Sequence, residues 1–526
     1  MAQTETINDA NKNDLVKNRA TQKEWLGLLV LALPCMLYSM DLTVLNLALP
    51  QLSLQLKPTA SQLLWIVDIY GFFVAGSLIT MGTLGDRIGR RKMLLIGGFV
   101  FAVASALAAF SNSTTMLIVT RALQGIAGAT LAPSTLSLIR VLFKDASQRA
   151  QAIGLWGASF SVGALIGPVV GGFLIEHFWW GSVFLINIPV MILLLIIGPK
   201  LLPEYKDPTS GKMDFLSAGL SLIAILFIIF GLKNFAENGL NFYALIIFVL
   251  GLFFGFIFVN RQDQLLKQGK YPLIDLSLFK NSTFNLLIIT NAMTMFVFFG
   301  TFIFTAQYMQ LVMGLSPLAA GLWSLPPTFG TIFSSSFGSQ LTKYMRPSTL
   351  MSSGLILGGI GFLLVSRVNG IQDLYLMVFA TILYSMGSVP VLLFTTNMLV
   401  NSAPPEKAST TAAISETGNE LGGATGIAIL GSVGTFMYHR EILKLIPENF
   451  SENIKNISST TLANAVDMAK GLTLTNPAQS SQLIKAANTA FITAFQTAML
   501  VAAVILFSLA LLVYKKLQHV KLENEN

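Results

Sequence analysis

Few ionisable side chains interrupt the long apolar runs of this sequence, but four acids and one arginine are placed where they could do charge chemistry. Asp41 and Asp68 lie in the first two apolar runs, Arg121 lies in the fourth, and Glu416 and Glu420 lie in a late one. A charge inside a bilayer costs about 2.5–3.5 kcal/mol or more, so each group needs a partner or a polar cavity. Carboxylates in such places can exchange protons and attract cations, although a plain hydrogen bond between helices also accounts for each of them.

Aromatic side chains accompany the two aspartates. Tyr38 and Trp65 each precede one of them by three residues, which puts each ring on the same helix face as its acid. Trp156 and Trp323 lie in further apolar runs. These four rings could stack on cationic ligands, but ordinary packing or anchoring at the membrane surface explains them equally well.

The late apolar run has two distinct faces. Glu416 and Glu420 are four residues apart, while Gly418, Gly422 and Gly426 recur every fourth residue on nearly the opposite face. The glycine face is expected to pack closely against another helix. The acidic face should look into a polar cavity, the alternative being a buried polar bridge between helices.

The elements that must position these residues are membrane helices. Of 526 residues 53% are hydrophobic and 11% are charged, whereas soluble proteins are about 25% charged. This composition predicts an all-α membrane protein. Runs of about 20 apolar residues can span a bilayer, and we count fourteen: 25–52, 62–81, 92–110, 116–142, 150–176, 183–202, 214–235, 241–260, 284–312, 318–341, 349–367, 374–400, 408–438 and 488–514.

Charge placement and cysteine content exclude several classes of partner. The 33 lysines and arginines outnumber the 25 acids, but they lie at the ends of apolar runs, so topology explains the excess and no nucleic-acid partner is expected. Cys35 is the only cysteine, and His177, His439 and His519 are scattered. We therefore predict no disulfide, no metal site and no cofactor.

Basic residues accumulate in alternate loops. Because basic loops stay in the cytoplasm, this pattern predicts an even number of spans with both termini cytoplasmic. The long polar segment 439–485 then lies outside the cell. Its run Leu462–Leu472 is as consistent with a short amphipathic helix as with disorder.

A charged loop, residues 82–92, connects the second and third runs. Gly82 and Gly89 allow a tight turn, and Asp86 can accept hydrogen bonds from the N–H groups of a helix N-terminus, so the loop could act as a gating latch. With Arg87 and Arg90 it forms the pattern G-x-x-x-D-R-x-G-R-R. This pattern resembles the loop between helices 2 and 3 of the major facilitator superfamily, although any cytoplasmic loop carries some arginines.

The fifth run contains a glycine groove. Gly163, Gly167 and Gly171 recur every fourth residue, so another backbone can approach closely there, and Pro168 breaks the helix hydrogen bonds beside them. With Gly172, the ending G-P-x-x-G-G resembles the antiporter motif of the same superfamily. Plain packing explains a glycine face equally well.

Together with Arg121 and its following Gln124, these motifs resemble the drug:proton antiporter family with fourteen helices, and most closely its QacA-like multidrug exporters. The stretches Trp65–Tyr70 and Phe184–Pro189 are similar as well. The resemblance implies a major facilitator fold of two six-helix bundles plus two inserted helices. The implied domains are a cytoplasmic tail (1–23), an N-terminal bundle (24–205), the inserted helices with a cytoplasmic loop (206–281), a C-terminal bundle with the external segment (282–514) and a second tail (515–526).

The resemblance also implies site roles. It gives Asp41 a part in proton coupling and cation recognition, and Glu416 and Glu420 match family acids in the thirteenth helix. Together with the charges and rings described above, this leads us to expect proton coupling by Asp41, Arg121 and Glu416. We expect substrate binding by Tyr38, Asp41, Trp65, Asp68, Trp156, Trp323, Glu416 and Glu420. Two departures from the family pattern are Ser415, where a second glutamate is expected, and the absence of any acid from 318–341. Fewer acids put the handling of divalent cations in doubt.

The function that these observations favour is proton-coupled multidrug efflux. The expected protein is a monomer in a bacterial plasma membrane that exports lipophilic, mainly cationic compounds such as antiseptics, dyes and antibiotics. One alternative is export of a neutral or anionic compound by the same fold. Another is a membrane-embedded enzyme, although no H-E-x-x-H, P-loop or serine-triad pattern is present.

Overall fold

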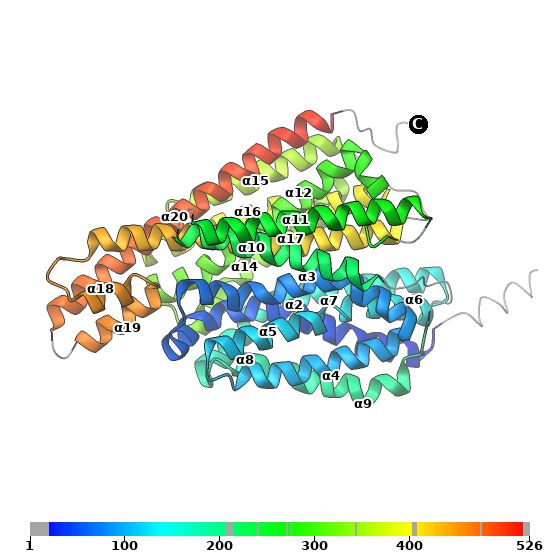
Figure 1. Ribbon diagram of the computed structural model, residues 1–526, viewed down its shortest axis with the longest axis horizontal. Helices are drawn as coiled ribbons and strands as arrows, with labels where there is room; N and C mark the ends of the chain where they lie inside the picture. The colour runs from blue at the N-terminus through cyan, green and yellow to red at the C-terminus, as the bar shows by residue number, and fades with distance from the viewer. Residues whose placement is uncertain are drawn as a thin grey trace, which may run out of the picture.

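The computed structural model describes residues 20–206, 214–238, 241–269, 272–274, 276–341, 345–401, 408–473 and 476–518. Every regular element within these ranges is a helix (Figure 1). Twelve helical spans in this part of the chain are long and apolar enough to cross a membrane. The predicted class, an all-α membrane protein, is confirmed.

The helices form two bundles with a pair between them. The first bundle contains α2 (Gln22–Leu56), α3 (Ala60–Ile88), α4 (Arg90–Ala109), α5 (Thr114–Gly128), α6 (Leu131–Leu142), α7 (Ala146–His177), α8 (Ser182–Leu185) and α9 (Asn187–Leu201). The intervening elements are α10 (Phe215–Asn238), α11 (Phe242–Lys267) and η1 (Leu276–Lys280). The second bundle contains α12 (Ser282–Gln307), η2 (Tyr308–Val312), α13 (Pro317–Trp323), α14 (Leu325–Leu341), α15 (Pro347–Val365), η3 (Ile371–Asp373), α16 (Leu374–Asn401), α17 (Ala408–Leu445) and α20 (Pro477–Lys516), with α18 (Glu452–Ser458) and α19 (Leu462–Leu472) at one end.

The twelve spans match twelve of the fourteen predicted runs. The predicted run 214–235 corresponds to α10, whose described apolar part, Leu216–Gly231, is shorter than a full span. The run 318–341 is divided into α13 and α14 at Ser324, just before Pro326 and Pro327. Proline has no N–H to continue a helix, which favours a break at this position. Fourteen spans remains a prediction.

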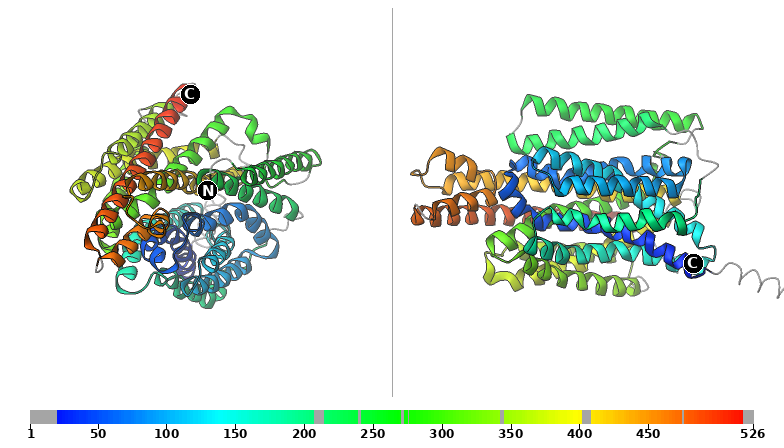
Figure 2. Two further views of the ribbon diagram at one scale, coloured as in Figure 1. Left: turned by 60° about the vertical axis from the view of Figure 1, so that its left-hand side comes forward. Right: turned by 90° about the horizontal axis from the view of Figure 1, so that it is seen from below.

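The helix α10 lies at the seam between the bundles, where it packs against both α3 and α17. Its Phe230 ring lies 6.0 Å from the ring of Trp65 on α3. Its Ile229 joins a buried cluster with Phe72 of α3 and Ala424 of α17. Packed on α10, α11 forms the edge of the molecule, so this pair (green in Figure 2) bridges the two bundles on one side.

An ion pair fastens α10 to α11. The Asp214 carboxylate, just before α10, accepts two hydrogen bonds of 2.8 Å from Arg261 of α11. Burial raises the pKa of Asp214, but hydrogen bonds from Arg261 and Ser217 outweigh burial and lower that pKa to about 2. Asp214 therefore stays ionised at neutral pH, and the pair is retained.

The end of the molecule where α18 and α19 lie, called the α19 end, contains more helix than expected for the polar segment 439–485. Two helices project beyond the others and meet α18 and α19 there (Figure 1): α17 with 38 residues and α20 with 40. At about 1.5 Å per residue both exceed a hydrocarbon core of about 30 Å. The helical alternative for Leu462–Leu472 is confirmed, since α19 has these bounds and the Thr461 side chain caps its first turn. Much of the segment 439–485 is therefore structured rather than a simple loop.

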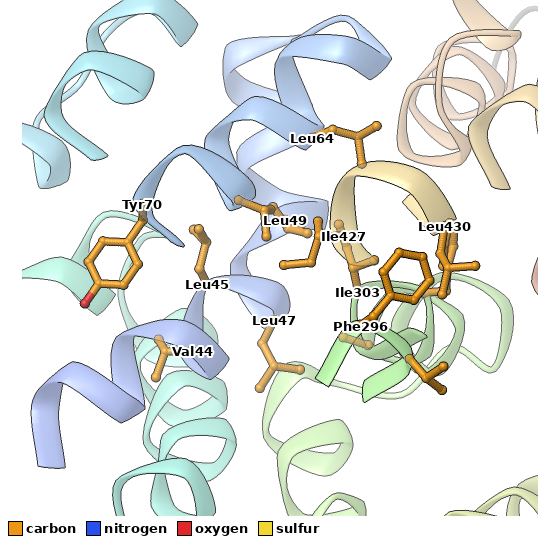
Figure 3. Packing of buried hydrophobic residues seen from close by; sticks show 14 of the residues in the cluster. Val44, Leu45, Leu47, Leu49, Leu64, Tyr70, Phe296, Ile303, Ile427 and Leu430 are labelled. Atoms are coloured by element: carbon orange, nitrogen blue, oxygen red, sulfur yellow. The ribbon is translucent and has the colours of Figure 1, made fainter. Parts of the chain in front are cut away.

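The two bundles meet at the α19 end. Leucines 47, 49 and 64 of the first bundle share one buried apolar cluster with residues 296, 303, 427 and 430 of the second (Figure 3). The Gln310 amide donates a 3.1 Å hydrogen bond to the carbonyl oxygen of Leu47. The backbone N–H of Leu318, in the first turn of α13, donates to Glu176 of α7 at 3.2 Å. This end is closed.

Toward the opposite end, where the charged loop lies, the described residues leave part of α7 uncovered. On α7, Gly172 packs against the backbone of Pro317, so its face is turned to the second bundle. Gly154 lies eighteen residues earlier, which is five full helical turns of 3.6 residues, and therefore on the same face. A side chain added at Gly154 or Gly157 would meet nothing within 4 Å. The face that is packed at the α19 end is open here.

Candidate functional site

A buried ion pair lies inside the first bundle. Arg121 of α5 donates a hydrogen bond through Nη1 to Oδ2 of Asp41 on α2, and both side chains are at most 4% exposed. Arg121 also donates through Nε to the carbonyl oxygen of Ile66, at 3.4 Å. Its guanidinium carbon lies 4.4 Å from the centre of the Tyr70 ring. A carboxylate, a carbonyl and an aromatic face thus compensate a charge that would be costly in a membrane.

Three neutral residues close a ring of hydrogen bonds around this pair. Arg121 donates to Gln124 at 3.1 Å, and Gln124 donates to the Ser105 hydroxyl of α4 at 2.8 Å. The Asn187 amide, the first residue of α9, donates to Ser105 at 3.3 Å and to Asp41 Oδ1 at 3.4 Å. Four helices therefore hold the carboxylate in position.

One hydrogen bond joins the two bundles near this ring. The Tyr38 hydroxyl of α2 donates to Oε1 of Glu420 on α17. The Tyr38 and Tyr70 rings lie 6.0 Å apart, and Tyr70 lies over Arg121. The Tyr70 ring thus lies next to both Tyr38 and Arg121. The acid of the second bundle and the ion pair of the first are separated by two aromatic rings.

These tyrosines continue an aromatic strip along α7. The Phe160 ring meets the Tyr38 ring edge-on at 6.0 Å, and the Trp156 ring meets the Phe160 ring edge-on at 5.0 Å. The Trp156 indole N–H donates to the Thr135 hydroxyl at 3.0 Å, which fixes the orientation of the ring. The strip therefore runs from Tyr38 toward the open part of α7.

Three other predicted substrate residues lie elsewhere. Trp65 packs against Phe72 and against α10 at the seam. Asp68 is buried, and its position three residues after Trp65 places it on that same face of α3. Trp323 meets the ring of Tyr375, which is 75% exposed. The structure thus groups Tyr38, Asp41, Trp156 and Glu420 and places the other three apart from the strip.

Helix α17 carries Glu416 and Glu420, and the side chain of Glu416 lies outside the described part of the structure. The opposite, glycine face packs on α12. A Cβ at Gly422 would lie 2.1 Å from the carbonyl oxygen of Ala292, and one at Gly426 would lie 2.0 Å from that of Phe296. The glycine spacing thus marks the helix contact, and Glu420 projects from the other side to Tyr38.

The glycine groove of α7 packs on α2. A Cβ at Gly163 would lie 2.1 Å from the carbonyl oxygen of Met36, and one at Gly167 would lie 2.2 Å from Thr43. Gly171 faces Val44. Since α2 carries Tyr38 and Asp41, this contact sets the position of both side chains.

The end of the same motif packs on the second bundle. A Cβ at Gly172 would lie 2.5 Å from the carbonyl oxygen of Pro317, and one at Gly321 would lie 2.3 Å from the carbonyl oxygen of Pro168. One face of the motif therefore contacts α2 of the first bundle, and the neighbouring face contacts α13 of the second bundle.

In the charged loop, Asp86 lies 2.5 Å from Arg90 in an ion pair between i and i+4. Gly89 has φ +115, a conformation that favours glycine, and Glu204 occupies the space a side chain there would need. The Glu204 carboxylate accepts hydrogen bonds from the backbone N–H groups of residues 91 and 92. The Glu204 carboxylate thus caps the N-terminus of α4. A capping contact of Asp86 with another helix stays a prediction. Gly82 packs near Pro133, and residue 87 is exposed.

Replacing Asp86 with asparagine tests whether the loop acts as a latch. We expect turnover to fall while substrate affinity is nearly unchanged, because the ion pair to Arg90 supports loop geometry and not the binding strip. Asp263→Asn is the matched control, since Asp263 forms an exposed i,i+4 pair with Lys267 on α11, away from the loop. Binding to the purified protein and uptake into inverted vesicles are measured in parallel. An affinity loss as large as the loss of transport would contradict the latch.

Four residues of the site and the loop were not predicted to have a role: Ser105, Phe160, Asn187 and Glu204. A signal existed for Asn187, which is the only uncharged side chain with hydrogen-bonding groups between Val183 and Leu202. The described residues contain no group of three or more His, Cys, Asp or Glu that could hold a metal ion.

Two helical bundles, with a buried ion pair inside the first and closely packed glycines at the contact between them, are typical of a membrane transporter. The chain belongs to the major facilitator superfamily, whose family model matches residues 31–427. It is therefore a transporter, which rules out the membrane-embedded enzyme.

The chain resembles bacterial efflux and resistance proteins over nearly its full length. It is 37% identical to the multidrug efflux pump LfrA of Mycolicibacterium smegmatis over 495 residues, which cover 94% of this chain and 96% of LfrA. It is 31% identical to the methyl viologen resistance protein SmvA of Salmonella typhimurium over 490 residues, covering 93% and 97%. Such relatives support an efflux transporter.

A solved structure shares the fold. A bacterial homologue of the human lysosomal transporter Spinster, in an inward-facing and unoccupied conformation, matches with a TM-score of 0.65 and 17% identity, covering 94% of this chain and 99% of that one. At this identity the likeness concerns the fold alone.

Proposed function

We propose that this protein exports lipophilic, mainly cationic small molecules in exchange for protons. The observation that carries the proposal is the aromatic strip from Trp156 through Phe160 to Tyr38, which ends at the Glu420 carboxylate. Rings followed by a carboxylate are the chemistry that binds an aromatic cation. The relative SmvA is named for resistance to methyl viologen, a compound of this kind.

Proton exchange is assigned to Asp41 with Arg121, and Glu416 is a further coupling acid. Protonation of Asp41 removes its negative charge and with it the attraction that holds the buried pair together. Substrate is bound by Tyr38, Trp156 and Glu420, with Phe160 added. Trp65, Asp68 and Trp323 stay in the proposed set as contacts at the seam and at the periphery.

The bilayer orientation follows from the basic loops. With the charged loop in the cytoplasm, both termini are cytoplasmic, α18 and α19 are external, and the structure is closed to the outside. Substrate then enters along the open part of α7 and leaves when the bundles rock about the central site. We propose a monomer in a bacterial plasma membrane, since the site is complete within one chain.

Transport by purified protein in liposomes with an imposed pH gradient tests the proposal. Tetraphenylphosphonium serves as a lipophilic cation, and a neutral and an anionic fluorophore serve as comparisons. We expect movement of the cation that depends on the gradient and collapses with a protonophore. Gradient-driven movement of the neutral or anionic probe alone would replace this function with the alternative one.

The hydrogen bond between Tyr38 and Glu420 makes a further prediction. It joins the bundles in the state closed at the α19 end. Hydrogen bonds to charged groups contribute about 1.5–3 kcal/mol, so Tyr38→Phe should shift the equilibrium toward the opposite state by about tenfold or more. Tyr70→Phe is the matched control, because the buried Tyr70 hydroxyl has no hydrogen-bond partner among the described residues.

The populations are measured as spin-label distances between the bundles. Labels at the exposed positions Asn112 and Arg367 report on the α19 end of each bundle. A distance distribution in Tyr38→Phe that equals that of Tyr70→Phe would mean that the bond does not stabilise the closed state.

A further inference from the structure

The Asn187 amide occupies an unusual place in the hydrogen-bonded ring. Its nitrogen donates to Asp41 Oδ1 and to Ser105. Its oxygen is buried, with no hydrogen-bond partner among the described residues, and the whole side chain is only 1% exposed. A buried carbonyl oxygen without a donor is costly, so its retention beside an ionisable carboxyl calls for a reason.

An amide is suited to a neighbour that changes protonation state. An ionised carboxylate only accepts hydrogen bonds, whereas a protonated carboxyl also donates one. The amide side chain carries a donor at one end and an acceptor at the other, and a half-turn about its last torsion exchanges them. It can therefore serve both forms of the same neighbour.

We propose that Asn187 is a positioning residue that serves Asp41 in both protonation states. Its amide nitrogen donates a hydrogen bond to the carboxylate, and its amide oxygen accepts a hydrogen bond from the carboxyl O–H once Asp41 is protonated. This inference rests on the proposed role of Asp41 in proton exchange. When a proton arrives from water, an O–H bond forms on Asp41 and the site changes from neutral to singly positive. Arg121 keeps its charge and its bonds to Gln124 and to the carbonyl of Ile66. On release the O–H bond breaks and the proton returns to water.

The side chains that the other helices present to Asp41 do not duplicate this role of Asn187. Among the described residues, α5 presents Arg121 and α3 presents the Tyr70 ring, while α4 presents the neutral Ser105. Toward α2, helix α7 presents the glycines 163, 167 and 171 and the ring of Phe160, none of which carries a charge. Asp68 lies on another face of α3, and Glu420 lies beyond the tyrosines.

The Asn187 amide should stabilise the protonated form of Asp41 more than the ionised form, and this difference sets the direction in which its removal shifts the pH midpoint. In the ionised state the hydrogen bond from the Asn187 amide to Asp41 is long, at 3.4 Å. Arg121 also donates a charge-assisted hydrogen bond to the same carboxylate, with or without Asn187. In the protonated state no other partner of Asp41 in the ring offers a free acceptor. Removing the amide should therefore disfavour the protonated form more, and lower the pH midpoint of proton exchange by about one unit.

Two substitutions of nearly equal size isolate the hydrogen bonding. Asn187→Val removes both donor and acceptor, whereas Asn187→Thr has the same shape as valine but keeps a hydroxyl that can donate and accept. Protons released on adding tetraphenylphosphonium to the purified full-length protein are measured over a pH series. We expect the midpoint to fall by about one unit in Asn187→Val and to stay near that of the parent in Asn187→Thr.

A control of the same kind exists in the second bundle. Asn291 is also 1% exposed, donates to a serine hydroxyl at 3.1 Å, and has a buried oxygen with no partner among the described residues. It has no bond to Asp41 in the ring, so Asn291→Val should leave the midpoint unchanged. Affinity for tetraphenylphosphonium well above the midpoint, where Asp41 is ionised in every variant, should agree within about twofold and shows that each variant is folded.

The outcomes separate the inference from the function on which it rests. If Asn187→Val and Asn187→Thr have equal midpoints, or if Asn291→Val shifts the midpoint as much, Asn187 has no special role, while proton coupling by the parent stands. If the parent protein itself releases no protons on binding the cation, the proposed function fails and the inference fails with it.

Discussion

Replacing Asp41 with asparagine is expected to reduce proton-coupled export of every substrate to the level of empty vesicles. Asparagine keeps the size of the side chain but cannot bind and release a proton. Asp41 forms the buried ion pair with Arg121 at the centre of the ring. The readout is substrate-induced proton release by the purified protein, together with pH-driven transport in liposomes.

This variant leaves the Arg121 charge without its carboxylate, and an unpaired buried charge can destabilise a protein by about 3–5 kcal/mol. The double variant Asp41→Asn with Arg121→Gln removes both charges and controls for this loss. We expect it to be folded and equally inactive. Glu416→Gln, by contrast, should weaken export selectively, most for cations. Proton release that survives in Asp41→Asn but not in Glu416→Gln would reverse the two roles.

A leucine at Gly163 is expected to abolish transport even though the protein still inserts into the membrane. The first added atom would lie 2.1 Å from the carbonyl oxygen of Met36, and that atom is backbone, which cannot rotate away. The helices α2 and α7 must then separate, and α2 carries both Tyr38 and Asp41. Gly167→Leu should also impair transport, since its Cβ would lie 2.2 Å from the Thr43 hydroxyl and 3.3 Å from the carbonyl oxygen of Met40, and the rest of the leucine needs still more space.

The control for this steric effect is Gly219→Leu on α10, where a side chain would meet nothing within 4 Å. Transport by this variant should stay within about twofold of the parent, because an exposed leucine is well tolerated on a membrane helix. Rates are compared at equal amounts of membrane-inserted protein. Full transport by Gly163→Leu would show that the groove contact is dispensable.

Local pattern was sufficient for much of the fold. Long apolar runs can only be helices in a bilayer, because every backbone polar group must be satisfied within the segment. The glycine repeats marked two of the tightest helix contacts, on α7 and on α17, since only glycine admits a backbone so close. At the α19 end, α17 and α20 extend beyond the predicted spans. Hydropathy marks only the apolar part of a helix that crosses the bilayer, and the polar turns that continue the helix outside it are not detected.

The site was less predictable, because helix periodicity says which residues share a face but not what the face meets. Tyr38 and Trp65 have the same spacing from an aspartate, yet Tyr38 meets Glu420 and Trp65 meets Phe230 of α10. At the charged loop, α4 is capped by Glu204, which lies over a hundred residues later and which no local pattern indicated. Such partners depend on how helices from distant parts of the chain are rotated against one another.

By itself the sequence determined that this protein is a helical membrane protein with a few costly charges inside it, because bilayer energetics act on each segment separately. Only the tertiary structure decided that Arg121 pairs with Asp41, that Ser105 and Asn187 complete the ring around them, and that Glu420 reaches across the seam. The physical reason is the separation along the chain over which each kind of interaction acts. Apolar content and glycine spacing are properties of a few turns of helix, whereas these bonds join residues from 80 to 382 positions apart, whose distances are set by the packing of whole helices.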